Sequence, residues 1–233
     1  MEFWIVTSQD LFYLQSALDL ANLAIAQRDV LKMGEYDSPK ACVLGAVMCS
    51  ASFLECSING LYDYARRPVR TTKLHHALAT VWSEAFDRQP MLAKYQIALA
   101  LAKREAFLAS AEPYQSTSAL LDLRNAIAHP KELGESEAQR RKLEARLNGM
   151  FAFNPKKEHR RDFFPDRCLS CDCAFWAVET AASFFLEFQR RMPRTAYVFV
   201  AESTIRSFAR RRERSAFGNC TLPISHELES SKR

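Results

Sequence analysis

Apolar residues spaced alternately three and four positions apart recur in one window after another, and this spacing constrains the fold more than any other feature. In the first such window, the residues with this spacing are Leu11, Leu14, Leu18 and Ile25. Side chains at that spacing lie on one face of an α-helix, and that face is stable only when buried against another element. The pattern predicts an amphipathic helix over residues 8–32.

The same spacing predicts more helices further along the chain. Only six glycines are present, which is few for an all-β fold because tight hairpins and bulges use glycine. Most of the connections are short, and short connections place consecutive helices side by side in opposite directions. We therefore expect an all-α protein, an antiparallel helical bundle whose further helices span residues 39–66, 71–87, about 91–110, about 117–129, 135–147 and 172–191.

Two segments depart from the bundle pattern. A charged insert follows the helix that ends at His129, and its second part, residues 149–167, has no periodicity and predicts a long loop. After Pro193 the sequence changes again. We expect a bundle domain over residues 1–193 and a basic, partly flexible C-terminal extension over residues 194–233. Within the extension, residues 195–203 form a strand or a short extended segment, and a helix lies near residues 203–214.

Composition indicates the compartment. No run of 18 consecutive apolar residues occurs, and the N-terminus lacks the basic region and long apolar stretch of a signal peptide. The seven cysteines are an odd number, and several lie within helical apolar runs. Free thiols in a reducing compartment are the simplest explanation. We expect a cytoplasmic protein that does not span a membrane.

Basic residues are concentrated in two regions, residues 139–167 and 206–214, although the net charge is only +5. Such clusters attract phosphate groups through Coulomb forces that depend strongly on salt. A solvated, solubilising surface has the same composition. Charge alone leaves both interpretations open.

The segment LLDLRNAIAHPKE, residues 120–132, combines a cation, an amide and an imidazole in about one and a half helical turns. Leu120 and Leu123 occupy the buried face, while Asn125 and His129 are four residues apart and project from the same side. Pro130 disfavours helical geometry at the residue before it. We expect the helix to end at His129.

These three side chains suit acid–base chemistry on a phosphodiester. A histidine can accept or donate a proton near neutral pH. The forked guanidinium of Arg124 matches a phosphate, and Asn125 can orient the imidazole. RNA cleavage by the neighbouring 2′-hydroxyl requires such groups and no metal. We expect no cofactor and no metal. One such histidine per chain suggests two copies that face each other in a homodimer.

A structural role for the same residues is the alternative. Glu55 lies on a polar line along the predicted second helix, together with Ser52, Asn59 and Arg66. An ion pair between Arg124 and Glu55 would satisfy both charges without any catalysis.

The run LRNAIAHP resembles the R-x4–6-H motif of the HEPN superfamily in its RN…H variant. The resemblance covers about residues 8–191. It implies a helical bundle, commonly dimeric, whose catalytic members are metal-independent endoribonucleases of toxin–antitoxin and phage-defence systems. It also implies RNA as a partner and an antitoxin or other protein as a further one. By this resemblance Arg124 and His129 are the catalytic residues, Asn125 is their polar neighbour, and Glu55 is the acidic residue that bonds to the motif arginine.

Other functions remain open. We expect Lys131 and Arg66 to contribute to substrate binding. HEPN-like proteins also include non-catalytic binding or dimerisation modules, and a nucleotide-sensing regulator would use the same basic cleft. Cys168 and Cys171 have the spacing of half a zinc site, with His159 nearby. Alternatively, Cys173 begins a buried helix, and the positive end of the helix dipole lowers the pKa of a thiol there. His75 and His76 are expected at the surface.

Overall fold

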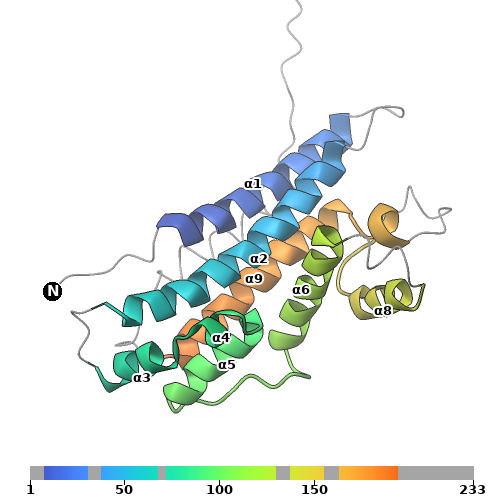
Figure 1. Ribbon diagram of the computed structural model, residues 1–233. Helices are drawn as coiled ribbons and strands as arrows, with labels where there is room; N and C mark the ends of the chain where they lie inside the picture. The colour runs from blue at the N-terminus through green and yellow to red at the C-terminus, as the bar shows by residue number, and fades with distance from the viewer. Residues whose placement is uncertain (1–7, 31–37, 68–71, 130–136, 155–162, 194–233) are drawn as a thin grey trace, which may run out of the picture.

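The computed structural model describes residues 8–30, 38–67, 72–129, 137–154 and 163–193, and the regular secondary structure in these ranges is helical throughout (Figure 1). This confirms the all-α prediction for the described part of the chain. The elements are α1 (Ser8–Val30), α2 (Ser38–Ala65), α3 (Lys73–Val81), α4 (Glu84–Asp87), α5 (Met91–Leu101), α6 (Tyr114–Ala128), α8 (Glu137–Leu147), the π-helical turn η2 (Phe163–Arg167) and α9 (Cys171–Arg191).

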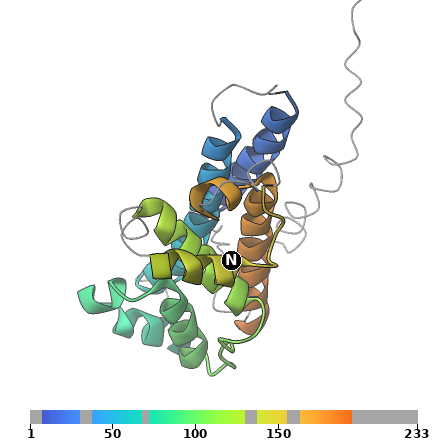
Figure 2. The same ribbon diagram turned by 90° about the vertical axis from the view of Figure 1, so that its right-hand side faces the viewer.

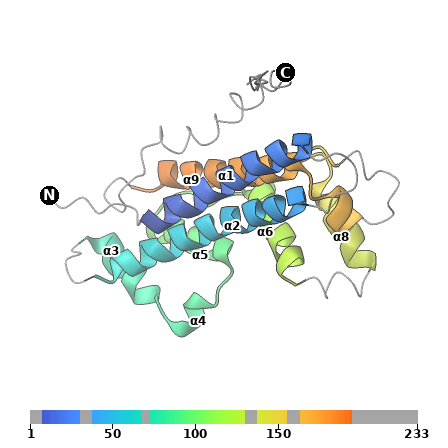
Figure 3. The same ribbon diagram turned by 90° about the horizontal axis from the view of Figure 1, so that it is seen from above.

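Three long helices, α1, α2 and α9, lie side by side and form the frame of the bundle (Figures 1 and 3). α9 begins beside the end of α1, where Cys171 Sγ lies 3.5 Å from the carbonyl oxygen of Ala24. Its middle meets the middle of α2, where the rings of Phe185 and Phe53 are 5.0 Å apart. The expected antiparallel arrangement therefore holds for α1 against both partners, whereas α2 and α9 run in the same direction.

Small residues bring α1 and α2 into close contact. Ala17, Ala21 and Ala24 on α1 are buried completely. On α2, a Cβ added at Gly45 would lie only 2.8 Å from Cδ1 of Leu20. Glycine at this position leaves room for the Leu20 side chain against the α2 backbone, which accounts for a glycine inside a long helix despite its low helical propensity.

Tyr95 attaches α5 to this frame. Its ring lies edge-on to Phe184 and Phe188 of α9, with centroid distances of 4.9 and 4.7 Å. Its hydroxyl is buried and donates a hydrogen bond of 2.8 Å to the carbonyl oxygen of Leu54 on α2. Edge-on aromatic contacts and a satisfied buried hydroxyl are both stabilising, so one side chain connects three helices.

The predicted helix over 71–87 is wrong in its second half. α3 ends at Val81, and Trp82 has the extended geometry φ −66°, ψ 118°. The hydroxyl of Ser83 then accepts a hydrogen bond of 3.1 Å from the backbone N–H of Phe86. Serine favours such local capping over the interior of a helix, and the chain starts the separate turn α4 here.

The helix predicted over about 91–110 is also shorter. α5 ends at Leu101, and Lys103 adopts the left-handed φ of 55°. Arg191 at the end of α9 holds the following segment by donating to the carbonyl oxygens of Glu105 and Ala106, at 3.2 and 2.9 Å. Its guanidinium also lies 4.3 Å from the ring centroid of Phe107.

α2 is the one described helix long and apolar enough to cross a membrane by composition, with a mean hydropathy of 1.8 over its best window in Pro39–Ala65. It packs between other helices of the bundle, and 56% of that window is buried. A core helix of a soluble protein has the same composition, and the packing is compatible with the expected soluble protein. The expected strand, helix and tail after residue 193 lie outside the described residues.

Candidate functional site at the end of α6

α6 carries the motif residues and ends where the sequence predicts. Leu120 and Leu123 are buried completely, as expected for the inward face. His129 directly follows α6, with φ −125° and ψ 63°, and its backbone N–H donates to the carbonyl oxygen of Asn125 at 2.8 Å. The imidazole is therefore carried by the last hydrogen-bonded residue of the helix, at its exposed end.

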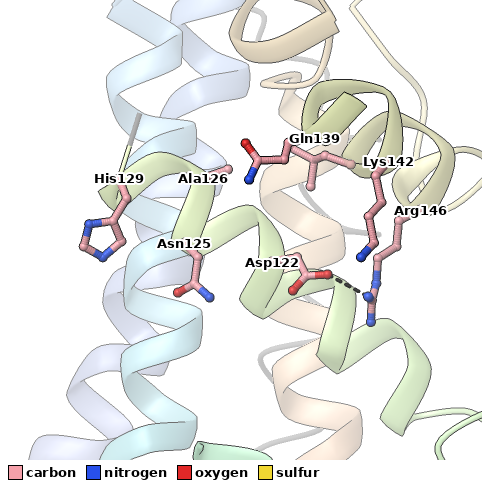
Figure 4. A pocket seen from close by; sticks show the side chains of 8 residues that line it. Asp122, Asn125, Ala126, His129, Gln139, Lys142 and Arg146 are labelled. Carbon is pink, nitrogen blue, oxygen red and sulfur yellow. Dashed lines mark ion pairs between the residues drawn. The ribbon is translucent and has the colours of Figure 1, made fainter. Parts of the chain in front are cut away.

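α6 and α8 are neighbours in the fold (Figure 2). An open hollow of about 200 Å³ lies between them, and Figure 4 shows side chains that line it. Residues three, four and seven positions apart on each helix face it, because this spacing selects one side of a helix. Its lining consists of Asp122, Asn125, Ala126 and His129 from α6 and its end, and Gln139, Lys142, Leu143 and Arg146 from α8. Figure 4 shows His129 on one side of Asn125 and the α8 side chains on the other.

Arg146 joins the two helices. Its Nη1 lies 2.7 Å from Oδ2 of Asp122, and its Nη2 donates a hydrogen bond of 2.6 Å to Oγ of Ser118. Both partners belong to α6, one turn apart. A guanidinium bound at two points has a defined orientation, so Arg146 sets how α8 lies against α6.

Four other polar side chains in the hollow are exposed: the amides of Asn125 and Gln139, the imidazole of His129 and the ammonium group of Lys142. Within the described ranges, the side chains of Asn125, His129 and Lys142 have no hydrogen-bond or ion-pair partner. The charge of Asp122 is compensated by Arg146. The hollow therefore combines a proton-transfer group, an amide and an uncompensated cation, which together suit a polar anionic ligand.

Arg124 faces a different neighbour. Its Nη2 lies 3.3 Å from Oε2 of Glu55 on α2, which confirms the contact expected from the sequence. The arginine side chain is 26% exposed and the glutamate side chain 49% exposed. Arg124 is not among the residues that line the α6–α8 hollow. The structure thus brings Asn125 and His129 to one hollow and Arg124 to α2.

Of the two expected substrate-binding residues, Arg66 does not line this hollow. Arg66 follows the end of α2, and its guanidinium lies 5.4 Å from the ring centroid of Trp82. Eleven residues separate it from Glu55, which is roughly 16 Å along a helix. Lys131 lies outside the described residues.

Cys173, in the first turn of α9, is not an activated thiol. Cys173 is buried, and burial followed by the side-chain hydrogen bond with Cys168 raises its pKa well above the usual value. Desolvation thus outweighs the helix dipole that the sequence suggested. No described cluster of three or more histidine, cysteine, aspartate or glutamate residues is placed to hold a metal ion. His159, the third residue of the weighed zinc site, lies outside the described ranges.

One histidine expected at the surface is buried instead. His75 is only 4% exposed, and its Nδ1 lies 2.7 Å from Oγ1 of Thr72, the residue that caps α3. It also packs edge-on against the ring of Tyr64. His76 is exposed as expected.

Sequence reasoning missed the α8 side of the hollow. The signal was present, because Gln139, Lys142 and Arg146 share one helical face with the buried Leu143. The sequence does not reveal that face, because the helix is strongly charged and only Leu143 and Leu147 in it are buried.

No family model, no curated protein and no solved structure matches the chain.

Proposed function

We propose that the protein is a metal-independent endoribonuclease of HEPN type, a HEPN-like bundle that acts in a toxin–antitoxin or phage-defence setting. The observation that carries the proposal is the position of His129. Its imidazole is exposed at the end of α6, where His129 lines the same hollow as Asn125 and Lys142. An imidazole without a partner in the described structure is available to exchange protons with a bound phosphodiester.

The reaction is attack of a ribose 2′-hydroxyl on the adjacent phosphorus. A base takes the proton of that hydroxyl, the 2′-oxygen bonds to phosphorus, and the bond to the 5′-oxygen breaks. An acid then protonates the departing oxygen, which leaves a 2′,3′-cyclic phosphate. His129 supplies the proton transfer, and Arg124 stabilises the negative charge that develops on the non-bridging phosphate oxygens.

A homodimer completes this scheme. One turnover needs both a base and an acid, and each chain offers a single histidine in the motif. Two copies of the end of α6 that face each other would place two imidazoles and two guanidinium groups around one phosphodiester. Arg124 then reaches the substrate from its position on Glu55, beside the hollow rather than inside it.

Cleavage of single-stranded RNA in EDTA tests the proposal. Wild-type protein is expected to cut a labelled transcript with chelator present, and His129→Ala is expected to lose about 10²–10⁴-fold in rate. His76→Ala is the matched control, because His76 is an exposed histidine on α3. No cleavage by the wild type, or equal cleavage by His129→Ala, would refute the proposal.

A non-catalytic binding or dimerisation module is the second candidate, and the Arg124–Glu55 ion pair favours it. An arginine engaged with another helix has a structural use that needs no substrate. This candidate predicts that the protein never cleaves RNA and that Arg124→Ala weakens self-association. Analytical ultracentrifugation of both proteins, together with the cleavage assay, distinguishes the two candidates.

A further inference from the structure

The α6–α8 hollow contains a cation that neither the motif nor its resemblance includes. We propose that Lys142 is a phosphate-binding residue for single-stranded RNA and that α8 supplies the substrate-binding half of the site. This inference rests on the proposed ribonuclease function, because it places the RNA chain next to His129.

The first argument is that the two cations of α8 that line the hollow differ in their partners. Arg146 is engaged with Asp122 and Ser118 and holds the helices together. Lys142 lies one turn earlier on the same face, is exposed, and has no ion-pair partner in the described ranges. The contacts of Arg146 with α6 therefore fix α8 so that the ammonium group of Lys142 lies at the hollow.

The second argument is the electrostatic setting of His129. The unpaired carbonyl groups at the end of a helix carry a partial negative charge, which disfavours a phosphate. A phosphodiester that approaches His129 at the end of α6 meets this charge. A cation in the same hollow compensates for it, and Lys142 is the hollow's cation that no carboxylate neutralises in the described structure.

The third argument concerns the shape of the hollow. It is open rather than enclosed, and Ala126 and Leu143 are its buried apolar residues. A site of about 200 Å³ with an open side accommodates a part of a chain that continues beyond it. Charge contacts to the backbone also require no particular base, so we expect binding with little sequence preference through this residue.

RNA binding by variants of α8 tests the inference. The chosen substitutions are Lys142→Met, which keeps the length of the stem without the charge, and Lys142→Arg, which keeps the charge. Arg141→Met is the matched control, since it removes one charge from the same helix at a residue outside the hollow that pairs with Glu137. The probe is a fluorescent single-stranded RNA with a 2′-O-methyl group at each position, which prevents cleavage.

We expect Lys142→Met to raise Kd about three- to fivefold and to reduce the slope of log Kd against log salt by about 0.7, as for one lost phosphate contact. Lys142→Arg and Arg141→Met should remain close to the wild type. Equal effects of Lys142→Met and Arg141→Met would mean that only net charge matters, which overturns the inference. Circular dichroism confirms that each variant is folded.

Two further results separate this inference from the proposed function. RNA binding that depends on Lys142, together with no cleavage by the wild type, supports the binding site and refutes the ribonuclease. Cleavage that is normal in Lys142→Met, with unchanged Kd, refutes the binding site alone. Adenosine monophosphate serves as a competitor, and its displacement of RNA at similar concentrations would show capture of a single nucleotide and overturn the assignment to an RNA chain.

Discussion

The ion pair between Arg124 and Glu55 allows a decisive test, because its structural and catalytic roles predict effects of very different size. The charged atoms are 3.3 Å apart, and both side chains are partly exposed to solvent. An ion pair in such a position contributes about 0.2–1 kcal/mol to the free energy of unfolding. For a chain of this length that corresponds to a fall in Tm of no more than about 4 °C in Arg124→Ala.

A role of Arg124 in transition-state stabilisation predicts a much larger effect on rate. Removal of one group that stabilises developing charge costs about 10²–10³-fold in rate. Arg124→Ala should therefore stay folded and lose nearly all cleavage activity. Glu55→Gln should lose a similar amount of stability and retain more of the activity, because the guanidinium remains.

The assay combines urea unfolding with RNA cleavage in EDTA for the wild type, both single variants and the double variant. The double-mutant cycle isolates the coupling energy of the pair, which we expect to be below about 1 kcal/mol and to shrink at high salt. A loss of several kcal/mol in Arg124→Ala would refute the assessment of the pair as a surface interaction. A cleavage rate within threefold of the wild type, in a folded Arg124→Ala protein, would refute the catalytic role.

Three further predictions concern the bundle itself. Phe185 is buried against Phe53, so Phe185→Ala should lower the free energy of unfolding in urea by about 3–5 kcal/mol, while Leu108→Ala, at a side chain 66% exposed, should change it by less than about 0.5 kcal/mol. Hydrogen bonds from Arg190, and then from Arg191, lower the pKa of Glu187 from 4.5 to about 2, so its carboxylate stabilises the fold above about pH 4.5 and this contribution is lost as the pH falls towards 2. Glu187→Gln should remove that part of the pH dependence in urea titrations, by less than about 1 kcal/mol because the carboxylate is partly exposed and its partner Arg190 is largely exposed. Because Cys173 is buried and its pKa is raised, we expect iodoacetamide at pH 8 to alkylate Cys173 only after urea unfolds the chain. Peptide mass spectrometry that found alkylated Cys173 in the native protein would contradict this.

The long helices were predictable because their cause is local. Periodic apolar residues define α1, α2 and α9 within a few residues, and Pro130 marks the end of α6 at His129. Where the predicted helix was too long, a local hydrogen bond or backbone turn ended the helix earlier. The hydroxyl of Ser83 takes a backbone N–H and separates α4 from α3, and Lys103 turns the chain after α5 through a positive φ.

The candidate site was predictable only on the helix that carries the motif. Asn125 and His129 share a face of α6 by spacing alone, and they meet at one hollow as expected. Lys142 and Arg146 were missed, because the few apolar residues of α8 do not indicate which side of this charged helix faces the bundle. His75 was misplaced for a related reason, since a histidine bonded to Thr72 can be buried in a helix that looks like a surface helix.

The amino-acid sequence by itself determined which segments are helical, which face of each long helix is buried, and where the helix of the RN…H motif stops. These properties follow from hydrophobic periodicity, capping and proline, which act over a few residues. Only the tertiary structure decided that Arg124 meets Glu55 on α2 while Asp122 and Ser118 meet Arg146 on α8. Spacing sets the direction of a side chain around its own helix, and the neighbour it finds there depends on how all the buried faces pack together.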